Sequence, residues 1–281
     1  MEIIDEYLDR LGRRNRRPGT INGYRKILRC IFAWLDEQGL ETDPERIGED
    51  DIVAFINRYH ARETTLKTYV GALSSFLKKQ GNRAVEDMNL LWNDTTTYNV
   101  RWIEPQDFER IIANAADPTD RIMVYLMAYG GLRRSEVADL RTADVLSDRM
   151  VVTGKGHGQG KTRVVPICSK LAAEIERYRA IRQGILGSIN DPHFLVCPRK
   201  GGWVELTPIW VWRRIHRLCI EAGVDATPHS FRRYFATQVY AKMPDKDLHI
   251  IQLLLGHTSP VTTARYIRAD AEGMCQAVER L

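Results

Sequence analysis

Near its C-terminal end the sequence places a tyrosine nine residues after a histidine. Both lie in LLLGHTSPVTTARYIR, residues 253–268, as His257 and Tyr266. A tyrosine most often packs in a core with its hydroxyl hydrogen-bonded, so packing is the ordinary explanation. The chemical alternative is a nucleophile, because a tyrosine hydroxyl can attack phosphorus and form a covalent intermediate. That alternative requires cationic groups elsewhere in the chain that can hold a phosphate.

Three further segments carry such groups. In AYGGLRRSEVADL, two glycines precede Arg133 and leave room for a backbone or a ligand to approach it closely. Lys155 stands between two glycines at an expected β-turn, from which it could reach a phosphate-linked oxygen as an acid. In TPHSFRRYFATQV, His229 and Arg232 are three residues apart near the start of an expected helix, whose N-terminus favours anions.

Each of these residues alone has an ordinary structural interpretation, such as a surface arginine or a solvated turn lysine. Together, two arginines, a lysine and two histidines would form a poor core but a good phosphate clamp. The planar guanidinium binds two phosphate oxygens at once, and the charge that develops in phosphoryl transfer needs fixed donors. The set therefore favours a nucleophilic tyrosine over a packed one.

The elements that position these residues are predicted to be mainly helical. Residues 1–92 contain apolar positions at helical spacing between polar breaks, and residues 93–103, which begin NDTTTYN, are predicted to be a linker. Residues 104–281 are expected to be largely helical, with one β-hairpin over residues 149–167. The predicted fold class is mainly α, with a helical-bundle N-terminal domain and a largely helical second domain that holds a small antiparallel sheet.

Composition narrows the class of protein. The 281 residues are 44% hydrophobic and 27% charged, which is ordinary for a globular protein. The chain has no apolar run long enough to span a membrane and no signal peptide at its start, so we expect a cytoplasmic protein without a membrane partner. Five scattered cysteines without a CxxC pair indicate a reducing compartment. His216 and Cys219 lack a second ligand pair, so no metal site is predicted there. No cofactor is predicted for this chain.

The net charge of +5 weakly suggests an acidic partner. Two local clusters, RRNRR and WRRIHR, indicate an acidic partner more strongly than the net charge does, although each could be a solvated helix face. We predict that duplex DNA is the partner and that six arginines of these clusters contact it: Arg13, Arg14, Arg16, Arg17, Arg213 and Arg214.

The chemical segments together resemble those of the tyrosine recombinases, also called phage-type integrases. GLRRSE is similar to the family's first box, TGKG with RVVP to its lysine hairpin, HSFRRYFAT to its His-x-x-Arg box, and LLGHTSPVTTARY to its ending. The resemblance covers the second domain, and the first domain looks more loosely like the family's core-binding domain. Arg233 stands where the family often has another histidine, and the hairpin is longer than usual, which leaves Lys161 as an alternative to Lys155.

This resemblance implies a role for each group. Tyr266 would attack the scissile phosphate and keep the 3′ end of the strand as a phosphotyrosine, and Lys155 would protonate the departing 5′ oxygen.

The resemblance also implies which groups would surround the phosphate. Arg133 and Arg232 would hold its non-bridging oxygens, and His257 would donate a hydrogen bond to them. His229 would assist proton transfer from the tyrosine, and Glu136 would orient the cluster.

The resemblance further implies a minimal, Xer-like site-specific recombinase that clamps DNA between its two domains. Four protomers on two DNA sites would exchange strands through a Holliday junction, and the free protein could be a monomer or a dimer. The tail, residues 267–281, would dock on its own protomer or on a neighbour. The alternatives are a type IB topoisomerase-like enzyme and a catalytically inactive DNA-binding relic. Chromosome-dimer resolution, plasmid maintenance and mobile-element integration remain open as roles, with nucleoid association expected.

Overall fold

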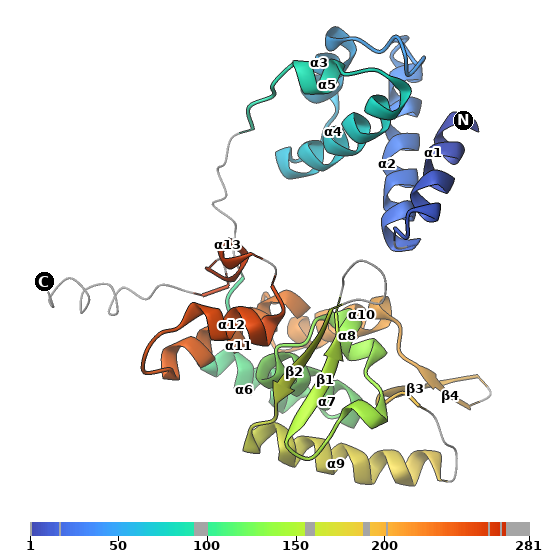
Figure 1. Cartoon of the computed structure of the whole chain (residues 1–281). Helices are drawn as coiled ribbons and strands as arrows, with labels where there is room; N and C mark the ends of the chain where they lie inside the picture. Colours follow the sequence, from blue (N-terminus) through green and yellow to red (C-terminus); the bar gives the residue numbers. More distant parts are fainter. Residues whose placement is uncertain are drawn as a thin grey trace, which may run out of the picture. The chain divides into compact units, whose positions relative to one another are not determined.

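A computed structural model describes residues 2–16, 18–92, 101–154, 161–187, 192–200, 202–257, 259–264 and 266–267. The chain divides into two compact units, one built mainly from the residues before position 98 and the other from those after it (Figure 1). Each unit has its own hydrophobic core. In the described part of the chain, no helix combines the length and apolar character needed to cross a bilayer.

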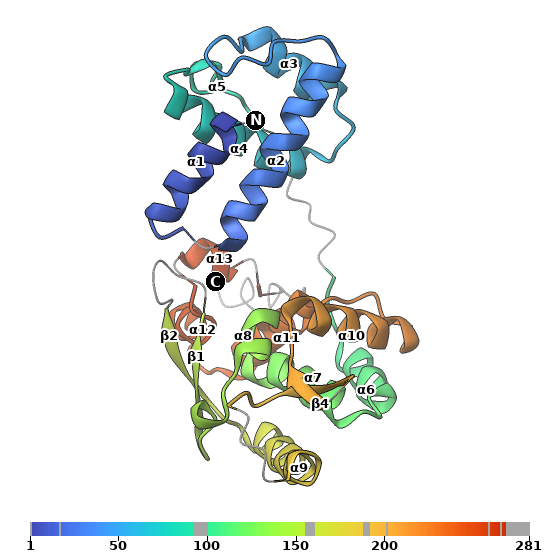
Figure 2. The ribbon, with the colours of Figure 1, turned by 90° about the vertical axis from the view of Figure 1, so that its right-hand side faces the viewer.

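The first unit consists of helices whose apolar residues recur every three to four positions. Its elements are α1 (Glu2–Arg13), α2 (Pro18–Glu37), α3 (Glu49–Arg58), α4 (Glu63–Leu77), the 3-10 turn η1 (Lys78–Gln80) and α5 (Ala84–Asp87). α1 and α2 run side by side, and α2 also packs on α3 and α4 (Figure 2). Their shared core includes Tyr7, Leu28, Phe55 and Phe76. The ring centroids of Tyr7 and Phe76 lie 5.3 Å apart, in an edge-to-face arrangement.

The second unit contains helices, turns and two short hairpins. In chain order these are α6 (Pro105–Asn114), α7 (Pro118–Gly130), α8 (Arg134–Asp139), η2 (Thr142–Asp144), β1 (Arg149–Thr153), β2 (Thr162–Pro166), α9 (Ser169–Leu186), β3 (Val196–Arg199), β4 (Gly202–Glu205), α10 (Pro208–Glu221), α11 (Pro228–Lys242), α12 (Leu248–Leu255) and α13 (Pro260–Ala264). The mainly helical fold class with a small antiparallel sheet is confirmed.

Helix α7 is the centre of the second unit. It is apolar on nearly every side, which is typical of a fully buried helix, and it packs against α8, α9, α10 and α11. Asp117 caps its start and Gly131 ends it in the left-handed conformation, at φ 62°. A Cβ at Gly131 would also lie 2.5 Å from the ring of Phe235 on α11, so only glycine fits there. This glycine brings the end of α7 against α11, two residues before Arg133.

The predicted hairpin is present. β1 and β2 pair antiparallel, with register from Arg149 opposite Pro166 to Thr153 opposite Thr162. A second antiparallel pair, β3 and β4, differs from the expectation, because the pattern of residues 171–281 predicts helices. Pro198 lies in β3, and a proline within a short run argues against a strand unless the strand is at an edge. β3 is such a strand, since among the described residues it pairs with β4 alone.

Candidate active site

The start of α8 places an arginine and a glutamate together. Arg133 occupies the N-cap position, and Glu136, three residues later, accepts its backbone N–H through Oε2 at 2.8 Å. The other oxygen of Glu136 accepts from Nη1 of Arg133 at 2.6 Å. This is the carboxylate half of a capping box, in which the third helical residue reaches back to the N-cap. The capping geometry therefore buries the Glu136 side chain, which is 1% exposed, directly under Arg133.

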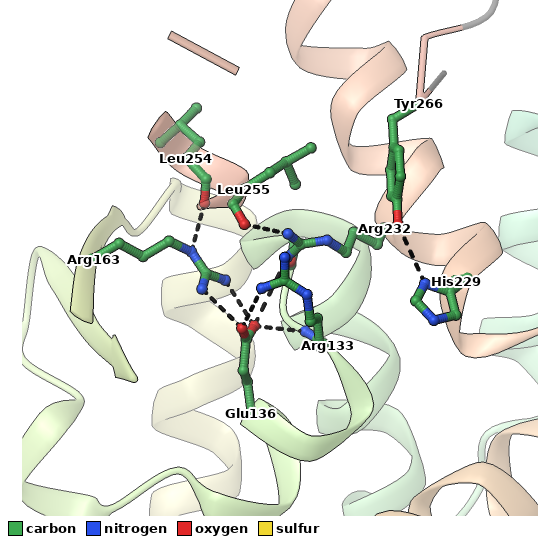
Figure 3. A network of polar contacts seen from close by, with 9 residues as sticks. Arg133, Glu136, Arg163, His229, Arg232, Leu254, Leu255 and Tyr266 are labelled. Carbon is green, nitrogen blue, oxygen red and sulfur yellow. Dashed lines mark hydrogen bonds and ion pairs between the residues drawn. The ribbon is translucent and has the colours of Figure 1, made fainter. Parts of the chain in front are cut away.

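A second arginine reaches the same carboxylate from the hairpin. Arg163 on β2 donates from Nη1 and Nη2 to the two oxygens of Glu136, at 2.9 and 2.8 Å, in the two-pronged geometry that suits a guanidinium. Its Nε donates to the carbonyl of Leu254 at 2.7 Å. Arg163 thus ties three separate segments together: the hairpin, the start of α8 and the end of α12 (Figure 3).

The third arginine, Arg232 on α11, is completely buried. It donates to the carbonyl oxygens of Gly131 and Leu255, at the ends of α7 and α12, and its Nη1 lies 3.8 Å from Oε2 of Glu136. Among the described residues its Nε has no hydrogen-bond partner. Burial, followed by the charge of Arg133, lowers the pKa of Arg232 to about 9, which still leaves it protonated at neutral pH.

One carboxylate therefore faces three guanidinium groups. Burial by itself would raise the pKa of Glu136, but the hydrogen bond and charge of Arg163 and then the charge of Arg232 outweigh it and lower that pKa to about 2. Glu136 is thus ionised at any physiological pH. Three positive charges against one negative charge leave the cluster with a net charge of about +2, which an anionic ligand can balance.

His257 lies beside this cluster, directly after α12. Gly256 ends that helix at φ 62°, a conformation that favours glycine, and a Cβ there would lie 3.1 Å from Cδ of Arg163, a tight contact. The ring of His257 is nearly buried, and its Nδ1 lies 3.1 Å from the hydroxyl of Thr263 on α13. Burial and then the charges of Arg232 and Arg133 lower the pKa of His257 to about 4, so the ring is neutral at pH 7.

Tyr266 stands next to His257, with ring centroids 4.7 Å apart. Its hydroxyl lies 3.4 Å from Nδ1 of His229, a long contact (Figure 3). The guanidinium of Arg233 lies 5.6 Å from the centre of the Tyr266 ring. His229 is solvent-accessible, yet the protein atoms packed around it and then the charge of Arg232 lower its pKa. A neutral His229 can accept a proton from the tyrosine hydroxyl.

The structure brings together six of the seven residues singled out for catalysis: Arg133, Glu136, His229, Arg232, His257 and Tyr266. Lys155 lies outside the described residues, although β2, which follows it, reaches the cluster through Arg163. The alternative Lys161 is exposed at the start of β2. No group of three or more histidine, cysteine, aspartate or glutamate side chains suited to a metal occurs among the described residues.

No role was predicted for Arg163 from the sequence. The residue lies in the RVVP motif, and the alternation of the strand contained a signal for its role. Arg163 and Val165 lie on the same face of β2, and Val165 is completely buried. An arginine on a buried strand face needs a carboxylate partner, which predicts a residue such as Glu136.

The arginines predicted to contact DNA differ in their surroundings. Arg13, Arg14 and Arg16 are exposed at the end of α1 and in the turn after it, Arg213 is exposed on α10, and Arg17 lies outside the described residues. Arg214 instead forms ion pairs with Asp120 and Asp117 at the start of α7. Its guanidinium is engaged in packing α10 on α7, so a contact of Arg214 with DNA would compete with this pair.

Comparison with known proteins agrees with this geometry. Residues 101–272 match the model of the phage integrase family, and residues 4–80 match that of the phage integrase N-terminal SAM-like domain. The chain belongs to the phage integrase family. Its relatives include the tyrosine recombinase XerA of Pyrococcus horikoshii, 27% identical over 99% of this chain and 93% of that protein, and XerD of Pseudomonas aeruginosa, 29% identical over 94% and 91%.

Solved structures of this integrase family show the same fold. A lambda integrase dimer bound to a COC' core site superposes with a TM-score of 0.74 at 17% identity, over 96% of this chain and 95% of that one. The XerH recombinase bound to palindromic difH, in a post-cleavage complex, gives a TM-score of 0.69 at 21% identity, over 94% and 80%. The arrangement of helices described above is therefore that of the integrase fold.

The Arg163 pair supports a stability prediction. Arg163→Met should lower the free energy of unfolding by about 3 kcal/mol, because it removes two hydrogen bonds to the buried Glu136 carboxylate and one to the carbonyl of Leu254. Urea denaturation of the full chain measures this. Arg149→Met is the matched control on β1, where an exposed pair with Asp148 contributes at most about 1 kcal/mol. Equal losses in the two variants would contradict a special role for Arg163.

Proposed function

We propose that this integrase is a site-specific DNA recombinase in which Tyr266 attacks the scissile phosphate of duplex DNA and forms a 3′-phosphotyrosine. The observation that carries the proposal is the position of the Tyr266 hydroxyl, within 3.4 Å of a neutral histidine and beside a buried cluster of three arginines and one glutamate. A nucleophile, a proton acceptor and a cationic phosphate site are the three parts that this chemistry needs.

The charge of the cluster suits a phosphodiester. Glu136 neutralises one guanidinium, and a phosphate bound beside it would bring a further negative charge that grows in the transition state. All three guanidinium nitrogens of Arg163 donate hydrogen bonds to protein oxygens. The side chain of Arg133 is instead partly exposed, and Nε of Arg232 has no hydrogen-bond partner among the described residues. Arg133 and Arg232 are therefore the arginines able to hold the non-bridging oxygens, and Arg163 positions them through Glu136.

The proton transfers follow from the histidines and the hairpin lysine. Neutral His229 accepts the proton of the Tyr266 hydroxyl as the oxygen attacks phosphorus. His257 donates a hydrogen bond to a non-bridging oxygen, and Lys155 protonates the departing 5′ oxygen. The phosphodiester bond of DNA is exchanged for a phosphotyrosine diester of similar energy, so rejoining needs no ATP.

Assembly is the second part of the proposal. Four protomers would bind two DNA sites, each protomer clamping DNA with both units, and exchange strands through a Holliday junction. A lambda integrase tetramer bound to a Holliday junction supports this, with a TM-score of 0.73 at 17% identity over 95% of this chain and 76% of that one. The tail beyond Ile267 lies outside the described residues, so its docking in cis or in trans stays a prediction. The enzyme would act in the cytoplasm, at the nucleoid.

The comparisons favour recombination over the alternatives. The relatives named above are tyrosine recombinases, and the site retains every described group that the chemistry requires, which argues against an inactive relic. A topoisomerase would relax supercoiled DNA regardless of sequence, whereas a recombinase needs its site. Cleavage tested at a recombination site next to the gene would also distinguish chromosome-dimer resolution from plasmid maintenance and mobile-element integration.

The nucleophile can be tested directly. Tyr266→Phe should bind DNA as the parent does but form no covalent adduct on a nicked suicide substrate, because only the attacking oxygen is removed. Adducts are detected by denaturing gel electrophoresis. Tyr240→Phe is the matched control, since Tyr240 packs against the same small apolar cluster on α11 and should leave adduct formation unchanged. Adducts at the parental rate in Tyr266→Phe would end the proposal.

The leaving-group acid can be assigned with a modified substrate. Lys155→Ala should slow cleavage of ordinary DNA by about 10²- to 10⁴-fold, the usual cost of losing a general acid. DNA with a 5′-bridging sulfur leaves without that proton, so the variant should cleave it almost normally. Lys161→Ala is the parallel variant. Rescue by sulfur in Lys161→Ala but not in Lys155→Ala would reverse the assignment.

The basic cluster of the first unit predicts a change in salt dependence. Substitution of Arg13, Arg14 and Arg16 by glutamine should weaken binding to all DNA sequences and reduce the slope of log affinity against log salt by about one for each arginine that binds a phosphate. Fluorescence anisotropy at several salt concentrations measures the slope. Arg46→Gln and Arg83→Gln, in exposed ion pairs of the same unit, are controls. An unchanged slope would make the cluster a solvated surface.

A further inference from the structure

One polar side chain beside the proposed site has no role in the mechanism above. Thr263 on the short helix α13 is completely buried, and its hydroxyl lies 3.1 Å from Nδ1 of His257. Its backbone carbonyl accepts the N–H of Tyr266 at 2.9 Å. Thr263 therefore contacts the proposed hydrogen-bond donor through its side chain and the proposed nucleophile through its backbone.

The contact matters because a neutral imidazole carries a single N–H. If that hydrogen is on Nδ1, then Nε2 presents a lone pair and repels a phosphate oxygen. If it is on Nε2, the ring can donate to that oxygen, and Nδ1 must then accept a hydrogen bond. A partner that donates to Nδ1 therefore stabilises the form with the hydrogen on Nε2.

The ring of His257 lies in the field of several charged side chains. Arg133, Arg163 and Arg232 all act on the His257 ring as positive charges, and only Glu136 opposes them. Positive charges favour a lone pair over an N–H on whichever ring nitrogen faces them. A hydroxyl can donate or accept, so the Thr263 hydroxyl can donate a hydrogen bond to Nδ1 and stabilise the form with the ring hydrogen on Nε2.

We propose that Thr263 is a positioning residue, whose hydroxyl donates a hydrogen bond to Nδ1 of His257 and so keeps the ring hydrogen on Nε2, where it can reach a phosphate oxygen. This inference deepens the proposed function and rests on it for the catalytic consequence. The form adopted by the ring is a property of the free protein, so this part can be tested without DNA.

Nitrogen NMR of the full chain labelled with ¹⁵N-histidine reports which ring nitrogen carries the hydrogen. His257→Gln identifies the signals of His257 by their loss. At pH 7 the parent protein should show the hydrogen on Nε2, and Thr263→Ser, which keeps the hydroxyl, should show the same. Thr263→Val has a similar shape without the hydroxyl and should shift the population toward the Nδ1 form. Thr262→Val, at an exposed position of the same helix, is the matched control.

The rate of covalent adduct formation on a suicide substrate supplies the second readout. Thr263→Val should lower this rate by up to about 10²-fold with unchanged DNA affinity, because the loss of one fixed donor to a developing oxyanion has an effect of that order. Thr263→Ser should restore most of it. If Thr263→Val does not fold, as judged by circular dichroism, the NMR spectra of the parent and of Thr263→Ser test the inference, because both should show the hydrogen on Nε2 of His257.

Three results would overturn the inference: a parent protein with the hydrogen on Nδ1, a Thr263→Val variant that keeps the parental form, or a shifted form without any change in rate. Failure of the proposed function looks different. In that case Tyr266→Phe would still form adducts while the NMR result on His257 held.

Discussion

The carboxylate of Glu136 is the group on which the described site depends. It accepts hydrogen bonds from Arg133 and Arg163 and lies 3.8 Å from Arg232, so it offsets part of the repulsion among three neighbouring guanidinium groups. Its pKa, lowered to about 2, means that this stabilisation is complete above about pH 4.5 and is lost as the pH falls toward 2. Without that charge, the mutual repulsion of the three guanidinium groups would not be offset by any carboxylate of the cluster.

Backbone geometry supports the same convergence. Arg232 donates to the carbonyls of Gly131 and Leu255, and Arg163 donates to that of Leu254, so both arginines bind the C-terminal ends of helices, where partial negative charge accumulates. Gly131 and Gly256 end these helices in the left-handed conformation, and at Gly131 the ring of Phe235 leaves no room for a Cβ. Through these hydrogen bonds, strand β2 and the ends of α7 and α12 meet around the site.

Much of this could be predicted from sequence, because arginines, histidines and a tyrosine at family-like spacings are rare in combination. The spacing of His257 and Tyr266 and the His229–Arg232 pair led to residues that the fold does bring together. Arg163 was missed because its role depends on a partner 27 residues away and on the face of a strand, which a motif does not express. Strand β3 was not predicted, because Pro198 argues against any strand that is not at the edge of a sheet. The roles of Lys155 and of the basic clusters stay predictions.

The most direct test of this account is the substitution Glu136→Gln, which keeps the shape of the side chain and removes its charge. The measurement is the single-turnover rate of covalent adduct formation on a nicked suicide substrate, together with DNA affinity at fixed salt. We expect a rate at least about 10²-fold lower with nearly unchanged affinity, because the arginines lose the carboxylate that they share while the DNA-binding surfaces remain. Adduct formation at the parental rate would contradict it.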